Sequence, residues 1–234
     1  MIATDQPTIF DDDIVAALSS IDDGNMKFGR GDDQETALSQ TVFLQSQEIE
    51  PLQTTLLNVG YDTTDFCRYV VFDDDQQGDG MLEPIATTEA DAAVVTRPDH
   101  AIFLPLADCA GVIIYDPMNK VLMVSHLGRH SVEQEGARKS LQFLIDEFET
   151  DPAEVKIWLS PMVGSDSYPL ETFGGRSLRQ VITSQFLQLG VDIRHIEVSE
   201  VDTAESDDYY SHSEYKMGER DFDGRFAIVA MMRD

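Results

Sequence analysis

Two apolar runs rich in β-branched residues, Val112–Tyr115 and Val121–Val124, flank a short polar segment and predict a β-hairpin. The connection Asp116–Asn119 has the sequence Asp-Pro-Met-Asn, which is typical of a tight turn because Asp suits its first position and Pro presets φ at the second. A two-residue loop at the centre of this turn would place Cys109 directly opposite His126. Their Cβ atoms would then lie roughly 4.5–5.5 Å apart on one face of the ribbon.

The remaining pattern alternates strands with amphipathic helices. Weak helical spacing near the start predicts a strand or a short helix with loops over Met1–Asp22. Helices are expected at Gln34–Glu48, Ser131–Glu149 and Gly175–Leu189, and further strands at Cys67–Phe72, Ala92–Thr96, Ala101–Leu104, Val155–Leu159, Ile196–Val201 and Arg225–Met231. This order favours an α+β fold in which mixed β-sheets pack with helices, as one sandwich domain over residues 1–234.

The charge balance narrows the choice of partners. The chain has 44 acidic and 16 basic residues, a net charge of −28. Nucleic acids and anionic membranes are therefore not expected as partners, because phosphate binding needs a basic surface. The acidity is spread along the chain, which is typical either of adaptation to high salt or of an ordinary acidic cytosolic protein.

Other bulk features point to a cytoplasmic protein. No apolar run approaches the ~20 residues of a membrane span, and no leader segment opens the chain. Its two cysteines, Cys67 and Cys109, do not make a disulfide framework.

Cys109 and His126 are the first candidate site, because a thiol and an imidazole at this distance can share a metal or form a nucleophile–base pair. Packing alone is the ordinary role of a buried cysteine and a strand-end histidine. A zinc site needs at least one more protein ligand. The acidic run Asp73–Asp75 is interpreted as a solvated loop, because it lacks the spacing of a calcium loop. Motifs for dinucleotides, nucleoside triphosphates and α/β-hydrolases are absent from the sequence.

Several segments, taken in order, resemble the laccase-domain family of YfiH type, whose members are also described as multicopper polyphenol oxidoreductases or purine nucleoside phosphorylases. The matching segments are Asn25 with Gly31-Asp32-Asp33, Glu89–Thr96, Ala107-Asp108-Cys109 with Tyr115-Asp116-Pro117, Val124–Gly128, Ser160–Gly164 with Tyr168, Leu189–Val191, Asp202-Thr203, Tyr210–His212 and Gly224-Arg225.

The resemblance implies a zinc ion held by one Cys and two His, in a pocket that cleaves or deaminates purine nucleosides. Cys109 and His126 match two of these metal ligands. The third ligand belongs to a Gln-x-His-Gly motif after a strand, expected here after Cys67–Phe72, so Gln77 stands where His should be. An amide oxygen is a poor zinc ligand. Copper is a less favoured metal, because laccase copper sites need many more than five histidines.

The resemblance also implies that phosphate attacks the ribose of a nucleoside. Asn25, Arg129 and Arg225 are then expected to bind substrate, and Asp108 to act beside Cys109 by orienting His126. Several arginines of the family pattern are replaced in this chain, and its acidity works against an anionic co-substrate.

Two alternatives remain open. One is a non-catalytic member that keeps the fold, has no cofactor, and binds a nucleoside or a protein partner. The other is a metal-free Cys–His hydrolase or deamidase, similar in fold class to the catalytic domain of cytotoxic necrotizing factor, with Cys109 as nucleophile and His126 as base. In each case we expect a monomer or a small homo-oligomer.

Overall fold

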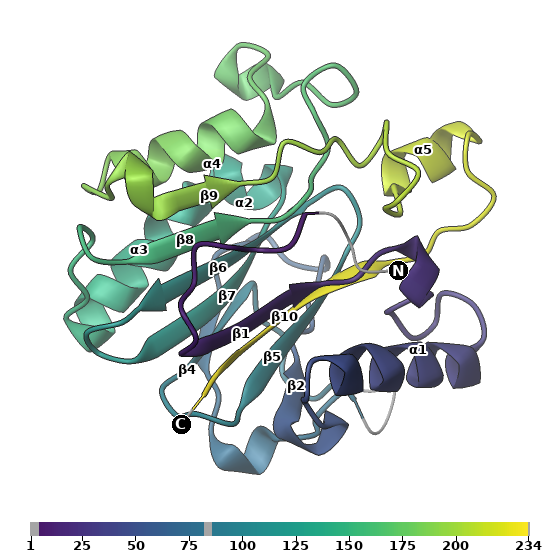
Figure 1. Cartoon of the computed structure of the whole chain (residues 1–234). Coiled ribbons are helices and arrows are strands. Elements are labelled where there is room, and N and C mark those ends of the chain that lie inside the picture. The colour runs from purple at the N-terminus through teal and green to yellow at the C-terminus, as the bar shows by residue number, and fades with distance from the viewer. Residues whose placement is uncertain (1–4, 82–85, 234) are drawn as a thin grey trace.

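Two mixed β-sheets form the centre of the molecule in a computed structural model that describes residues 5–81 and 86–233 (Figure 1). The larger sheet has the strand order β3-β4-β7-β6-β8-β9, and the smaller has the order β1-β10-β5-β2. The strands are β1 (Ile14–Leu18), β2 (Thr54–Leu56), β3 (Tyr69–Val71), β4 (Ala92–Val95), β5 (Ala101–Leu106), β6 (Ala110–Asp116), β7 (Val121–Leu127), β8 (Lys156–Leu159), β9 (Ile196–Val198) and β10 (Phe226–Met232). The α-helices are α1 (Asp33–Ser46), α2 (Arg129–Glu133), α3 (Gly136–Phe148), α4 (Leu178–Leu187) and α5 (His212–Met217).

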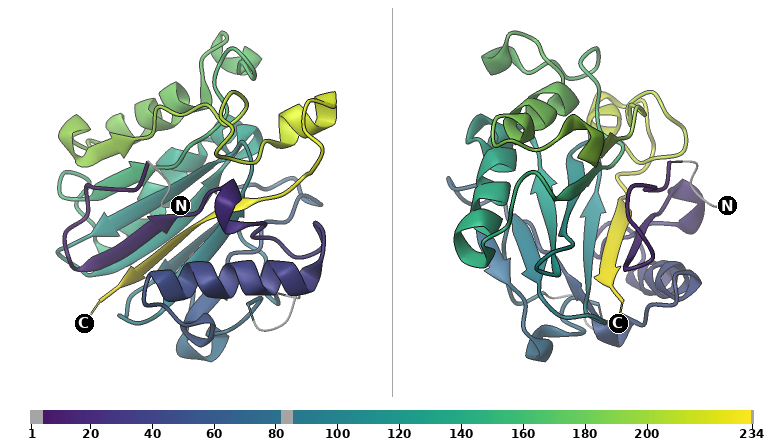
Figure 2. Two further views of the ribbon diagram at one scale, coloured as in Figure 1. Left: turned by 45° about the vertical axis from the view of Figure 1, so that its right-hand side comes forward. Right: turned by 60° about the vertical axis from the view of Figure 1, so that its left-hand side comes forward.

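The layers follow from which face of each strand is apolar. In β10, Ile228 faces the larger sheet while Val229 faces α1, so the smaller sheet is buried on both sides. The larger sheet likewise packs against the smaller one on one face and against α3 and α4 on the other (Figure 2). The result is a four-layered sandwich, and the expectation of mixed sheets packed with helices is confirmed.

The N-terminal apolar segment forms strand β1, one of the two alternatives expected for it, and this strand pairs with β10. Three details differ from the sequence expectations. The helix expected over Ser131–Glu149 is two helices, α2 and α3, separated where Glu135 has a φ of 63°. The elements β2 and α5 were not expected from the sequence, since each is too short to show a periodic pattern.

The central hairpin forms with a different register from the one expected. Gly111, not Cys109, pairs with His126, because the turn has four residues rather than two. The Asp116 carboxylate accepts hydrogen bonds from backbone N–H groups inside the turn, and Lys120 closes it with a φ of 52°. The shift is two residues, so Cys109 and His126 remain on the same face of the sheet.

Within the described residues, no helix has both the length and the apolar content that a membrane crossing requires.

One buried acid predicts a pH effect on stability. Burial, with repulsion by Glu197, raises the pKa of Asp5 from 3.8 to about 6, and its Oδ2 has no hydrogen-bond partner among the described residues. A raised folded-state pKa contributes stability below pH 4 that is lost as the pH rises through 6. Asp5→Asn should therefore stabilise the protein by about 1 kcal/mol at pH 7.5, allowing for partial exposure, and have no effect near pH 3.5.

The measurement is urea unfolding at both pH values, with the exposed Asp12→Asn as control. An Asp5→Asn gain that is equal at the two pH values, or absent at both, contradicts this account.

Candidate functional site

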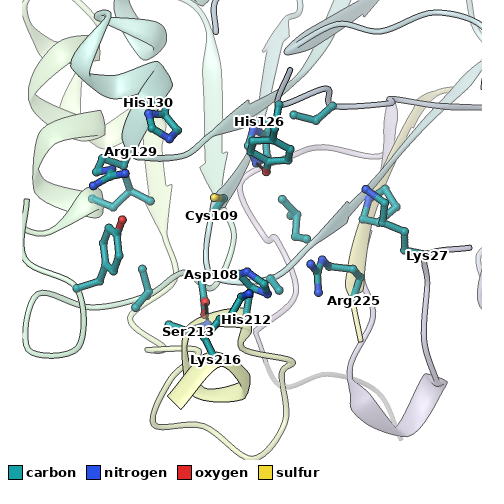
Figure 3. Close-up of a pocket in the computed structure, with 18 of the residues that line it drawn as sticks. Lys27, Asp108, Cys109, His126, Arg129, His130, His212, Ser213, Lys216 and Arg225 are labelled. Atoms are coloured by element: carbon teal, nitrogen blue, oxygen red, sulfur yellow. Dashed lines mark hydrogen bonds between the residues drawn. The ribbon is translucent and has the colours of Figure 1, made fainter. Parts of the chain in front are cut away.

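A cavity of about 760 Å³ opens where β5 and β7 end and β6 begins, and α5 forms part of its wall (Figure 3). Cys109 and His126 both line it, so the structure brings the expected pair together. Gly128 lies between them: a Cβ added there would be 2.7 Å from the Cys109 Sγ and 3.5 Å from the His126 Cε1. The thiol and the imidazole are therefore near neighbours on the cavity floor.

Tyr61, which follows β2, faces the same imidazole. Its hydroxyl oxygen lies 3.4 Å from the His126 Nε2, and the two rings are perpendicular with centroids 6.1 Å apart. Tyr61 was not expected at this site from the sequence. Its position directly after an apolar run, in the segment Asn58–Tyr61, was the one indication in the sequence. Because β2 has only three residues, the pattern did not show that a strand leads Tyr61 to this cavity.

Burial governs the protonation of the pair. It raises the pKa of the Cys109 thiol to about 12, with a further contribution from Asp108, and it lowers the pKa of His126 to about 4. A Cys–His dyad needs the opposite shifts, a lowered thiol pKa and a histidine able to take the proton. The electrostatics therefore give no support to a metal-free Cys–His hydrolase.

This environment predicts an unreactive thiol. At pH 7.5 we expect iodoacetamide to alkylate Cys109 at least about 100-fold more slowly than free cysteine, because only the thiolate reacts. Mass spectrometry of timed samples measures the rate, and the urea-unfolded chain is the control in which Cys109 should react normally. Rapid labelling in the folded protein would show that the thiol is activated.

The donor set does not fit the zinc that the family resemblance implies. Catalytic zinc sites have three protein ligands and structural sites have four. Cys109 and His126 supply two, and no three His, Cys, Asp or Glu side chains converge anywhere in residues 5–81 and 86–233. The group opposite the His126 Nε2 is the Tyr61 phenol, and burial raises the pKa of Tyr61 well above its usual value of 10.0, so a neutral phenol stands there.

The structure does not bring Gln77 to this pair. Its amide donates a hydrogen bond to the Asp99 carbonyl, just before β5 begins, whereas Leu106 at the other end of β5 lines the cavity. A six-residue strand spans about 20 Å. The placement of the third-ligand motif after Cys67–Phe72 is therefore wrong. The chain that faces His126 is the segment after β2, which contains Tyr61.

Asp108 forms hydrogen bonds within the cavity wall and does not orient His126. It adopts a left-handed backbone conformation with a φ of 71°, and its carboxylate accepts hydrogen bonds from the Thr203 hydroxyl at 2.9 Å and the Ser213 N–H at 2.7 Å. The expected hydrogen bond from Asp108 to His126 is replaced by these contacts. Asp108 thereby connects the start of α5 to the segment that contains Cys109.

The charge of the cavity is opposite to that of the protein. Five of the 16 basic side chains line it but, among the described residues, only one of the 44 acidic ones, Asp108. The five are Lys27, Arg30, Arg129, Lys216 and Arg225. The overall acidity of the chain therefore does not describe the lining of this cavity.

The basic residues lie on both sides of the Cys109–His126 pair (Figure 3). On one side, Lys27 and Arg225 approach each other, and burial together with repulsion by Arg225 lowers the pKa of Lys27. On the other side, the Arg129 guanidinium lies over the Tyr168 ring, 5.9 Å from its centroid. A planar, polarisable surface on one side and a group of basic side chains on the other suit a heterocycle with an anion.

Asn25 supports this wall from behind. Its side-chain amide donates to the Lys27 carbonyl at 2.7 Å, and its oxygen accepts from the Arg225 backbone N–H at 3.0 Å. Asn25 itself does not line the cavity among the described residues, so the structure places it as a support for two cavity residues.

The four-layered sandwich with a thiol, an imidazole and a basic wall in one cavity defines a particular class of α+β protein. Residues 16–173 match the model of the family described as multi-copper polyphenol oxidoreductase laccase. The chain belongs to this family, which confirms the resemblance of YfiH type seen in the sequence.

Solved structures with the same fold include YlmD from Geobacillus stearothermophilus, with a TM-score of 0.84 and 16% identity over 95% of this chain and 93% of that one. The YfiH protein of Bacillus licheniformis gives a TM-score of 0.83 and 16% identity, covering 94% and 93% of the two chains. The Neisseria meningitidis protein NMB0706 gives 0.74 and 16%, covering 98% of each. No curated protein matched the sequence.

Proposed function

We propose that this protein binds a purine nucleoside together with phosphate in the cavity beside Cys109 and His126. The observation that carries the proposal is the concentration of basic side chains in this cavity, in a chain whose net charge is −28. A cleft lined mainly by one sign of charge attracts ligands of the opposite charge. The nucleoside part of the proposal comes from the family resemblance, supported by the Arg129–Tyr168 surface on which a base can stack.

The proposal does not depend on zinc. A volume of about 760 Å³ lies within the range of small-molecule sites, and the phosphate-binding groups are side chains of the protein itself. Cys109, His126 and Tyr61 then form the neutral floor between the two parts of the ligand. A cytoplasmic protein that binds the two molecules side by side, as a monomer or a small homo-oligomer, satisfies these constraints.

Isothermal titration calorimetry of protein freed of metal by chelation tests the proposal. We expect phosphate to bind with a Kd below about 1 mM, more weakly as salt increases, and inosine or adenosine to bind the same protein. Zinc added in a parallel titration should bind in less than one equivalent. Chromatography of the same mixtures shows whether free base is released. Absence of any phosphate binding at low salt overturns the proposal.

A further inference from the structure

His212 and Asp223 form a pair at the edge of the same cavity. The His212 Nδ1 lies 2.9 Å from the Asp223 Oδ1, and the Asp223 side chain is only 10% exposed. Burial alone would raise the pKa of Asp223, but hydrogen bonds from Arg225 and His212 outweigh it and lower that pKa. Arg30 also pairs with this carboxylate. Asp223 is thus a fixed anion with three donors around it.

This contact determines which His212 nitrogen carries the proton. An ionised carboxylate only accepts hydrogen bonds, so Nδ1 must be the donor. In a neutral imidazole the other nitrogen is then an acceptor. The structure shows no partner for Nε2 among the described residues, and His212 lines both the main cavity and an adjoining one of about 620 Å³. A lone pair therefore faces a space in which Arg30 and Lys216 also lie.

A hydrogen-bond acceptor beside basic side chains favours anions that carry a proton. Arg30, Lys216 and Arg225 attract any oxyanion, but the Nε2 lone pair repels an oxygen that carries no hydrogen. Hydrogen phosphate and arsenate keep a proton at neutral pH, whereas sulfate and selenate of similar size have none. Asp221 and Asp223 also line the adjoining cavity, but their charges repel all of these dianions alike, so the discrimination depends on the hydrogen bond to Nε2.

We propose that His212 makes the site selective for protonated oxyanions, by accepting a hydrogen bond from the P–OH group of phosphate. The inference rests on the phosphate binding proposed above and adds a residue and a specificity to it. His212 is here a specificity-determining residue, held in its tautomer by Asp223.

Calorimetry at pH 7.5 with inorganic phosphate, arsenate, sulfate and selenate tests the inference on the unmodified protein. We expect phosphate and arsenate to bind at least tenfold more tightly than sulfate and selenate. Equal affinities for all four would overturn the inference while leaving the proposed function intact. Failure of all four to bind would remove both.

A variant then assigns the selectivity to His212. In His212→Asn the side-chain amide N–H can still donate to Asp223, but no atom remains at the Nε2 position. Phosphate affinity should fall to the level of sulfate, with sulfate affinity unchanged, while His195→Asn behaves as the unmodified protein. A tenfold preference that survives in His212→Asn contradicts the assignment. If the variant does not fold, the four-anion comparison decides alone.

Discussion

Replacing Lys27 with methionine is expected to weaken phosphate binding at least about tenfold and to stabilise the folded protein. Among the described residues Lys27 makes no ion pair, and its pKa is lowered first by burial and then by repulsion from Arg225 and Arg30. A charge-assisted hydrogen bond contributes about 1.5–3 kcal/mol, more than the 1.4 kcal/mol that corresponds to a factor of ten. Removing it should therefore have a clear effect on affinity.

The stabilising effect has the same origin. A half-buried cation near two guanidinium groups raises the free energy of the folded state without ligand, so an apolar residue of similar length should increase the free energy of unfolding by about 1 kcal/mol. Lys139→Met, on the exposed face of α3, is the matched control and should change neither quantity. Calorimetry with phosphate and urea unfolding measure the two effects. Unchanged affinity, or a loss of stability, would show that Lys27 does not belong to an anion site.

The general architecture could be predicted from sequence because it depends on local patterns. The two β-branched runs around Asp116–Asn119 indicate a hairpin wherever they occur, and α4 and α3 show helical spacing. The register could not be predicted, because it depends on the left-handed conformation of Lys120, which lengthens the turn. An error of two residues did no harm to the site, whereas an error of one would have separated Cys109 from His126.

The basic wall could not be predicted, because its members come from distant parts of the chain. Lys27 lies before α1, Arg129 begins α2, and Arg225 precedes the last strand. No local pattern joins them, and a net charge of −28 describes the whole surface rather than one cavity. Tyr61 could not be predicted for a related reason. The strand before it, β2, is positioned by parallel pairing with β5, and local periodicity does not report such a long-range contact.

Gly128→Ala should destabilise the protein by roughly 1–3 kcal/mol, and most of this loss should depend on Cys109. The backbone of Gly128, with φ of −103° and ψ of −175°, is accessible to alanine, so the cost is one of space and not of conformation. The new Cβ would lie 2.7 Å from the Cys109 Sγ, which must move within a packed floor.

A double-mutant cycle separates this contact from general damage to the fold. If the clash is with sulfur, Gly128→Ala should cost less than about 0.5 kcal/mol in a Cys109→Ala protein, a coupling of the size expected for neighbouring side chains. Urea unfolding of the four proteins gives the coupling energy. Because the new methyl group would lie against Cys109, apart from Lys27 and Arg225 (Figure 3), all four should still bind phosphate. An equal cost in both backgrounds would mean that the Cys109 sulfur does not lie against Gly128. The Cys109 thiol and the His126 imidazole would then not be neighbours in the cavity, and the match of this site to the family pattern would be lost.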